Sequence, residues 1–349
     1  MPDILNGARI CAILALAAGL AAFVFVVHRL ARQPLEERAD PGTGRALETA
    51  APQPIAGQPF AFASNAECRP CHQDIWDECA GDQHSRAWFN EPLLTQDPRR
   101  TECNNCHAPE PILETGIEEL AVIRTARFEE GVGCIECHRN GDHVEGPLPG
   151  AEAACNPVQN EAFTSSNICN ACHAAHGSFA EWQASEWAEE GVTCQGCHMP
   201  LVERASSSDG PLRHVRSHRM RTQRDPALLR EALTFGAALD GRALVVSLAN
   251  TGAGHNVPGE IFNRELFVAT RFASPDGREL AAYRESLKTV KREQRSTEQS
   301  TQLRAGESRT WKYAVPPGPG VVEVAVRYKD FFLAPDEAAQ EVYAQTLEY

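Results

Sequence analysis

The chain has 349 residues, of which 42% are hydrophobic, so it is long enough to bury one large core or two smaller ones. Its formal net charge of −14, with no block of lysine or arginine, argues against a nucleic-acid-binding protein. Thirteen cysteines are unusual for a cytosolic enzyme, and an odd number cannot close entirely into intramolecular disulfides.

The chain begins with an apolar run, residues 10–27, that contains no charged side chain. This length is short for a membrane-spanning helix and long for the core of a signal peptide. The run continues past the small residues Gly19 and Ala21, where cleavage would occur, so we expect an uncleaved signal-anchor helix within residues 1–30. One arginine precedes the run and two follow it, so the flanking charges point weakly to the opposite orientation.

A linker and then a repeated cysteine motif follow. Residues 31–60 contain five prolines and no helical periodicity, so we expect a tether there. Residues 61–222 contain five C-x-x-C-H motifs, which we number in chain order. They are Cys68, Cys71 and His72; Cys103, Cys106 and His107; Cys134, Cys137 and His138; Cys169, Cys172 and His173; and Cys194, Cys197 and His198.

The pattern C-x-x-C-H is the attachment site of a c-type haem. Two thiols bind the two vinyl groups of one porphyrin, and the histidine after the second cysteine becomes the proximal iron ligand. Zinc knuckles occur in pairs and disulfide frameworks need no trailing histidine, so neither explains five such motifs. We predict five covalently attached haem c groups, with the five motif histidines as proximal ligands. Because haem attachment takes place on the export side, we expect a single-pass protein of the bacterial inner membrane with its bulk in the periplasm.

The spacing of the motifs predicts the architecture of residues 61–222. At this density the porphyrins would form the core, which predicts a mainly α-helical and irregular pentahaem cytochrome c domain. The second motif resembles the fourth, and the third and fifth motifs share an E-E-G-V lead-in that contains Gly131 and Gly191. We infer that two-haem modules recur, with the first motif as an additional haem.

The composition changes after His218, where cysteine disappears. Residues 226–235 look like a short helix. Strand-like runs follow, separated by turn signals, at residues 243–248, 266–272, 311–315 and 321–328. We therefore expect an all-β, sandwich-like domain over residues 223–349.

The ligand on the other face of each iron decides whether a haem only transfers electrons or also binds a substrate. Seven histidines lie outside the motifs, and His28 sits at the edge of the apolar run, so six candidates remain for five distal positions. His255 lies in a loop of the predicted β-domain, which it would pin to the haems. The main distal candidates are His84, His143, His218 and His255, and the further candidates are His176, His214 and Cys155.

Three cysteines lie outside the motifs: Cys11, Cys79 and Cys155. Cys11 falls in the apolar run. For Cys79 and Cys155 we expect a disulfide bond. The alternatives are an axial thiolate from one of them, which would lower the potential of a haem, or two free thiols.

In these residues the chain resembles the multihaem c-type cytochrome superfamily of bacterial periplasms. That superfamily includes the tetrahaem cytochromes of nitrifiers and, more distantly, the pentahaem nitrite reductases. The resemblance covers about residues 64–260 and rests on residues 68–88, 131–143 and 181–200, on the His218-Arg219 pair and on the G-H-x-x-P-G loop at His255. It implies close-packed haems, mostly with two histidine ligands, and implies that His84, His143 and His218 are distal ligands.

The chain departs from the superfamily pattern in three places. Trp187 stands where members often have a histidine, so one ligand could be missing. Pro258 meets Gly259 directly, whereas the superfamily loop usually has a threonine before its final glycine. The C-x-x-C-K motif of the nitrite reductases is absent, which weighs against that activity.

The sequence therefore predicts a membrane-anchored pentahaem cytochrome that relays electrons between a membrane donor and a redox partner protein. Its acidic surface favours a basic partner, and no nucleic acid is expected. One alternative is a reductase or oxidase that acts at one five-coordinate haem. Another is an electron-transfer subunit of a larger membrane complex, such as a quinol oxidase assembly or a photosynthetic reaction centre. No catalytic residue is assigned.

Overall fold

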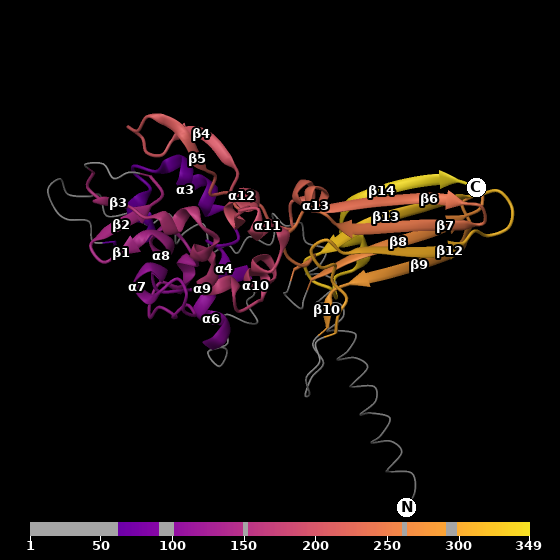
Figure 1. Ribbon diagram of the computed structural model, residues 1–349, viewed down its shortest axis with the longest axis horizontal. Helices are drawn as coiled ribbons and strands as arrows, with labels where there is room; N and C mark the ends of the chain where they lie inside the picture. Colours follow the sequence, from indigo (N-terminus) through magenta and orange to yellow (C-terminus); the bar gives the residue numbers. More distant parts are fainter. Residues whose placement is uncertain (1–61, 91–100, 149–152, 260–263, 291–298) are drawn as a thin grey trace, which may run out of the picture.

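The computed structural model describes residues 62–90, 101–148, 153–259, 264–290 and 299–349. Two regions lie side by side: residues 62–222, here called the motif region, and residues 223–349, here called the β-region (Figure 1). The expected signal-anchor helix and linker, residues 1–60, lie outside the described residues. In the part of the chain that is described, no helix is long and apolar enough to cross a bilayer. The expectation of a single-pass inner-membrane protein is corrected accordingly.

Short helices carry the motifs, because one C-x-x-C-H motif occupies little more than one helical turn. Four of these helices end at the motif histidine: α6 (Thr101–His107), α8 (Cys134–His138), α9 (Asn170–His173) and α12 (Cys194–His198). The first motif directly precedes α3 (Gln73–Ala80). The remaining elements are η1 (Asn65–Cys68), α4 (Ala87–Asn90), α7 (Ile112–Thr115), η2 (Phe128–Glu130), η3 (Glu161–Thr164), η4 (Ser166–Cys169), α10 (Ser178–Gln183) and α11 (Glu186–Glu189).

The expectation of a mainly α-helical, haem-packed fold is wrong, because the described residues are 33% strand and only 27% helix. Even the motif region contains sheets. β1 (Arg139–Asn140), β2 (His143–Gly146) and β3 (Pro157–Gln159) form one, and β4 (Leu201–Ala205) and β5 (Leu212–Arg216) form a hairpin. These strands are two to five residues long and carry many charged side chains, so they show no run of alternating apolar residues to predict them from.

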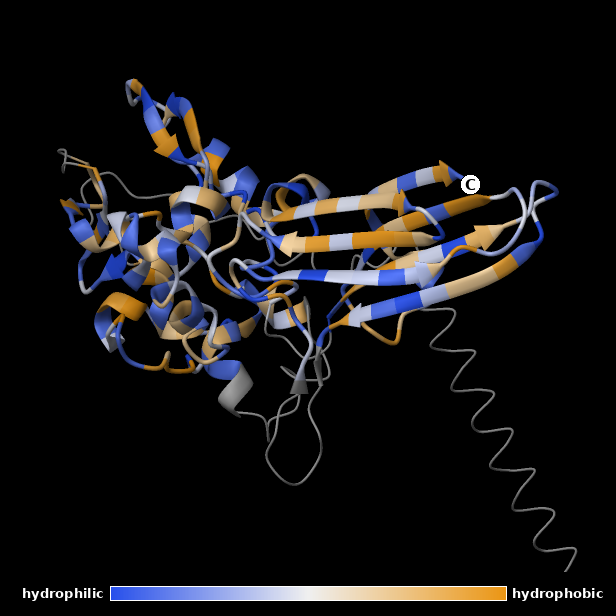
Figure 2. Cartoon of the chain, turned by 45° about the vertical axis from the view of Figure 1, so that its right-hand side comes forward, coloured by the Kyte–Doolittle hydropathy of each residue, from blue (hydrophilic) through white to orange (hydrophobic). Residues whose placement is uncertain are grey.

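The β-region is a sandwich of a three-stranded sheet, in the order β12-β7-β6, and a four-stranded sheet, in the order β14-β13-β8-β9. Apolar residues alternate along its strands (Figure 2), and the inward-facing ones of β7 (Leu244, Val246) and β13 (Val322, Val324) are buried in one core. The elements are α13 (Pro226–Ala232), β6 (Leu233–Asp240), β7 (Ala243–Asn250), β8 (Glu265–Ala273), β9 (Glu279–Leu287), β10 (Thr289–Val290), β11 (Gln299–Ser300), β12 (Ser308–Ala314), β13 (Val321–Lys329), η5 (Asp336–Ala338) and β14 (Gln340–Glu348).

The loop that follows β7 joins the two regions. Asn256 donates hydrogen bonds to the carboxylate of Glu181 in α10 from its backbone N–H, at 2.9 Å, and from its side-chain amide. Gly254 lies so close to α11 that a Cβ atom there would come within 3.0 Å of Ser185 and of Trp187. Glycine is required at this point for the close approach, and the loop is held against the motif region on both sides of His255.

Candidate haem-binding site

Three pairs of histidine rings face each other, and each pair contains one motif histidine. The other member of each pair comes from a distant part of the chain, and we call it the facing histidine. The distances between ring centroids are 6.1 Å for His84 and His173, 6.2 Å for His138 and His218, and 6.2 Å for His198 and His255.

These separations fit two imidazoles on opposite faces of one iron. A metal–nitrogen bond of about 2.0 Å and a distance of about 1.1 Å from ring nitrogen to ring centre, on each side, would place the two centres about 6.2 Å apart. The interplanar angles differ, at 75° for the fourth motif, 35° for the third and 17° for the fifth. The residues present therefore fit haem iron with two histidine ligands at three of the five motifs.

The hydrogen bonds of the motif histidines leave the ligating nitrogen free. A backbone carbonyl can only accept, so a ring nitrogen bonded to one is the protonated nitrogen, and the other keeps its lone pair for a metal. Four motif histidines donate from Nδ1 in this way: His72 to Ser206 (2.5 Å), His107 to Ala87 (2.6 Å), His138 to Glu145 (2.6 Å) and His198 to Arg221 (2.6 Å).

The facing histidines are oriented by the same kind of bond. Nδ1 of His218 lies 3.1 Å from the carbonyl of Arg216, and Nδ1 of His255 lies 2.9 Å from that of Asn256. For His84 the partner of Nδ1 is a side chain, because Oδ1 of Asp82 lies 3.2 Å away. In all three rings Nε2 remains available for the space between the paired rings.

Desolvation lowers the pKa of four of the six paired imidazoles and so favours their neutral form, which is the form that binds a metal. It lowers the pKa of His138 and of His198. The effect is larger for two others, since burial lowers the pKa of His173 to about 3 and that of His218 to about 4.

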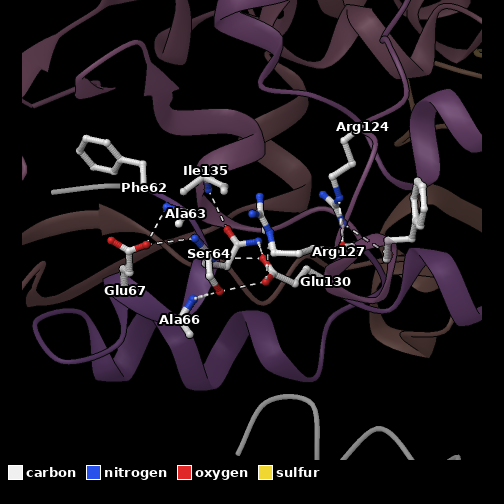
Figure 3. A network of polar contacts seen from close by, with 12 residues as sticks. Phe62, Ala63, Ser64, Ala66, Glu67, Arg124, Arg127, Glu130 and Ile135 are labelled. Carbon is white, nitrogen blue, oxygen red and sulfur yellow. Dashed lines mark hydrogen bonds and ion pairs between the residues drawn. The ribbon is translucent and has the colours of Figure 1, made fainter. Parts of the chain in front are cut away.

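Residues between the two cysteines of a motif fix the motif in place. Glu136 of the third motif is buried and accepts from Arg124 at 2.6 Å, from the backbone of Gly133 at 2.7 Å and from Asn65 at 2.9 Å. Asn65 in turn accepts from the backbone N–H of Ile135 at 2.8 Å. Figure 3 shows the polar contacts beside this network, in which Ser64 and Glu130, from segments far apart in the sequence, lie together.

The fifth motif is fixed in a comparable way. Gln195 is buried and donates from its side-chain amide to the carbonyls of Phe163 at 3.2 Å and of Ser165 at 2.7 Å. The phenyl ring of Phe163 stacks on the ring of His138, with 4.7 Å between centroids and 7° between planes. One short segment therefore touches both the third and the fifth motif.

Thiols of different motifs lie in contact. Side-chain hydrogen bonds join Cys68 to Cys134 and Cys169 to Cys194. A third joins Cys106 of the second motif to Cys172 of the fourth. Cys137 is close enough to the fourth motif for its charge to raise the pKa of Cys172. The five attachment sites therefore form one connected group.

The structure does not bring every candidate ligand to a motif histidine. It pairs neither His72 nor His107 with a second histidine ring in the part of the chain that it describes. His143, on β2, bonds through Nε2 to Glu145 at 3.0 Å, and that bond raises its pKa. His214 lies on β5. His176 lies in the turn after α9, close enough to His173 of the fourth motif for its charge to lower the pKa of that histidine.

The expected disulfide bond between Cys79 and Cys155 is absent, since both are free thiols. Burial raises the pKa of Cys79 to about 12, so this thiol stays protonated at neutral pH. Burial also raises the pKa of Cys155, and the charges of Cys68 and Cys71 in the first motif add to the effect. Cys155 therefore lies near the first motif.

Sequence reasoning missed Asp82 and the set of Asn65, Arg124 and Glu136. The spacing of Asp82 two residues before His84 was a usable signal, because an aspartate often bonds to groups two positions along the chain. The role of Asn65 and Arg124 depends on contacts across the fold, and no local pattern marks it. Among the described residues, no group of three or more histidine, cysteine, aspartate or glutamate side chains could hold a metal ion.

Comparison with known proteins gives one informative likeness. No family model and no curated protein matches the chain. The crystal structure of a penta-heme cytochrome c552 from Thermochromatium tepidum is similar, with a TM-score of 0.64 and 17% sequence identity over 84% of this chain and 100% of that one. Two further structures reach a TM-score of only 0.19, which is too low to indicate a shared fold. They are a DUF3823 family protein from Bacteroides ovatus (9% identity, 33% of this chain, 53% of that one) and the putative ApaA protein from Bordetella pertussis (13% identity, 33% of this chain, 88% of that one). The fold of the chain is therefore similar to that of a multihaem cytochrome.

Proposed function

We propose that this chain is a c-type cytochrome that holds five haems and relays electrons between redox partners. The observation that carries the proposal is the set of three facing histidine pairs, each built on a C-x-x-C-H motif and each at the spacing of a doubly ligated iron. Haem with two histidine ligands supplies one-electron transfer without an open position for substrate. The likeness to a structure that is named a penta-heme cytochrome supports the same conclusion.

The contacts between thiols suggest how the attachment sites connect. The first motif touches the third through Cys68 and Cys134, and the fifth touches the fourth through Cys194 and Cys169. Cys137 of the third motif lies near the fourth. The series therefore runs through motifs one, three, four and five, and the second motif joins at the fourth. A connected series of this kind is what a relay requires.

The charge of the chain suggests the partner. A formal net charge of −14 attracts a basic protein and speeds its encounter, most strongly at low ionic strength. We propose a basic redox protein as the partner. The test is the rate of electron exchange with a basic and with an acidic small cytochrome as salt is raised: the basic one should be faster and should slow with salt. Equal rates would contradict this part of the proposal.

A second function is favoured by one observation. His72 and His107 lack a facing histidine ring in the described residues, so the first or the second motif could hold a haem that is open to a small substrate. Such a haem would make the protein a reductase or an oxidase. Carbon monoxide separates the two functions, because it binds ferrous haem only where the sixth position is open. Uptake by one haem would favour the enzyme, and no uptake would favour the relay.

The haem count tests the proposal directly. The full chain, produced in a bacterium that carries the cytochrome c maturation machinery, should show the mass of the polypeptide plus five haems. Cys137→Ala should lower the haem count or leave the third haem attached through Cys134 only. Cys79→Ala is the matched control, because Cys79 is also a buried thiol but lies outside every motif. A wild-type protein without covalent haem would overturn the proposal.

A further inference from the structure

We propose that Asp82 is a positioning residue that strengthens His84 as an iron ligand and lowers the reduction potential at the fourth motif. The inference rests on the proposed function. Asp82 is only 6% exposed. Its Oδ1 accepts from the backbone N–H of His84 at 2.9 Å and lies 3.2 Å from Nδ1 of the same residue. Its Oδ2 accepts from the backbone N–H of Met220 at 2.9 Å.

Asp82 differs from the groups that bond to the other motif and facing histidines. Seven motif and facing histidines have an Nδ1 partner in the described residues, and for six of them it is a backbone carbonyl. Within that set, His84 is the one whose Nδ1 lies against a carboxylate. A neutral carbonyl orients a ring, whereas a carboxylate also draws the Nδ1 proton toward itself.

The carboxylate changes the electronic character of the ligand. An imidazole that donates to an anion carries more negative charge on Nε2 and is the stronger donor to a metal. A stronger donor stabilises ferric iron more than ferrous iron, which lowers the reduction potential. The backbone N–H of His84 also donates to Oδ1 of Asp82, so the same oxygen contacts both the backbone and the ring of His84 and fixes the orientation of the ring.

The position of the fourth motif gives the inference a functional meaning. Cys172 and Cys169 contact thiols of the second and the fifth motif, so the fourth attachment site is the junction of the series. Asp82 also holds the segment that follows His218, the ligand facing the third motif, through its bond to Met220. A lowered potential at the junction would make it the site from which electrons pass most readily to its neighbours.

Ring geometry allows this one site to be followed in the whole protein. The rings of His84 and His173 are nearly perpendicular, at 75°, and perpendicular axial imidazoles give ferric haem a highly anisotropic low-spin paramagnetic resonance signal. The rings of His198 and His255, at 17°, would give an ordinary rhombic signal instead. A redox titration followed by this spectroscopy therefore separates the fourth site from the fifth.

The experiment compares two substitutions in the five-haem protein. Asp82→Asn should shift the midpoint of the highly anisotropic signal to a more positive potential and move the signal itself, with the rhombic signal unchanged. Glu78→Gln is the matched control. This substitution removes a carboxylate from the helix that precedes Asp82. Glu78 accepts hydrogen bonds from Arg204 at 2.8 Å and from the backbone N–H of His218 at 2.7 Å, and neither donor is an imidazole nitrogen. This control should leave the signal of the fourth site in place.

The outcomes distinguish this inference from the proposed function. A wild-type protein with five haems and no highly anisotropic signal would contradict the assignment of His84, and with it this inference, but not the haem count. A signal that is present and responds equally to both substitutions, or to neither, would overturn the role of Asp82 and leave the relay intact. Should Asp82→Asn fail to assemble, Asp82→Ser and Asp82→Glu give the same comparison of a neutral with a charged partner, and Asp82→Glu should keep the lower potential.

Discussion

His255, from a loop of the β-region, faces His198 of the fifth motif with 6.2 Å between ring centroids and 17° between ring planes. Asn256, the next residue, fixes the loop by bonding to Glu181. The β-region therefore supplies one side of a candidate haem site whose other side belongs to the motif region. The β-sandwich is therefore more than a docking module attached to the motif region, because it contributes His255 to the candidate site.

The first prediction follows from this contact. His255→Ala should leave five haems attached, because attachment depends on the motif cysteines, and should convert one haem from low spin to high spin. Optical and paramagnetic resonance spectra measure the change, which should remove the rhombic signal. His143→Ala is the control, since that histidine bonds to Glu145 and faces no motif histidine in the structure. Spectra that respond to His143→Ala but not to His255→Ala would contradict the ligand assignment.

The sequence was enough to predict the motifs but not all of their partners. The pattern for covalent attachment lies within five consecutive residues, so spacing alone predicts each attachment site. A facing histidine is set by how remote segments pack. His84, His218 and His255 were among the candidates and lie opposite motif histidines. His143 had an equally good position in the sequence, but β2 places its ring against Glu145.

In the β-region, too, some elements could be predicted from the sequence and others could not. The strand-like runs predicted in the β-region lie within β7, β8 and β13 and, except for residue 315, within β12, because alternating apolar residues there pack into one core. β6, β9 and β14 were missed, and most of their residues are only half-buried or exposed. All three are edge strands of their sheets, so neighbouring strands cover fewer of their side chains and their apolar pattern is weaker.

The second prediction concerns the buried ion pair that holds the third motif. Arg124 and Glu136 are 4% and 2% exposed and lie 2.6 Å apart. Arg124→Met leaves the carboxylate of Glu136 buried without its cation, which should lower the free energy of unfolding by about 3–5 kcal/mol. Urea unfolding of the holoprotein, followed by the recovery of tryptophan fluorescence, measures the loss.

Arg127→Met is the control for this prediction. Arg127 belongs to the same segment, is 36% exposed and lies 3.5 Å from Glu130. An exposed pair of this kind contributes about 1 kcal/mol or less, so the urea midpoint should move little. Equal losses in the two variants would mean that the buried pair has no special role.

The third prediction is a dependence of stability on pH in the β-region. Burial alone would raise the pKa of Glu265, but Arg284, Ser286 and Lys329 together lower it to about 2. A carboxyl group whose pKa is lowered on folding stabilises the protein above its unfolded pKa of about 4.3, and that contribution is lost as the pH falls through the folded value. Wild-type stability should therefore fall between about pH 5 and pH 2.

Glu265→Gln should remove most of this dependence, because the amide does not titrate. The variant should be less stable than wild type at pH 7 and should approach it at low pH; urea midpoints at several pH values measure both. The remaining dependence should come from Asp336, whose pKa Arg284 also lowers to about 2, and from Asp225, Glu231 and Glu307, whose pKa values are lowered as well. Glu323→Gln, at an exposed pair with Arg271, should keep the wild-type profile, and parallel profiles for Glu265→Gln and wild type would contradict the assignment.

The fourth prediction uses two glycines that share the E-E-G-V lead-in. Gly131 and Gly191 both have positive φ, at 59° and 75°, so alanine is strained at either position. The strain is the larger at Gly131 because its ψ of −127° lies outside the left-handed helical region that other residues can adopt. The positions differ in their surroundings. A Cβ on Gly131 would lie 2.5 Å from the carbonyl oxygen of Ser85 and 2.6 Å from that of His84, whereas a Cβ on Gly191 meets nothing within 4 Å.

Gly131→Ala should therefore lower stability more than Gly191→Ala, by about a further 1–3 kcal/mol, because the backbone beside His84 must move. The same displacement should alter the highly anisotropic signal of the fourth site, which Gly191→Ala should leave unchanged. Urea midpoints and paramagnetic resonance spectra of the two five-haem variants measure both effects. If the two alanines lower stability equally and leave the spectra alike, the segment around Gly131 does not support His84, and the position of that ligand depends on Asp82 instead.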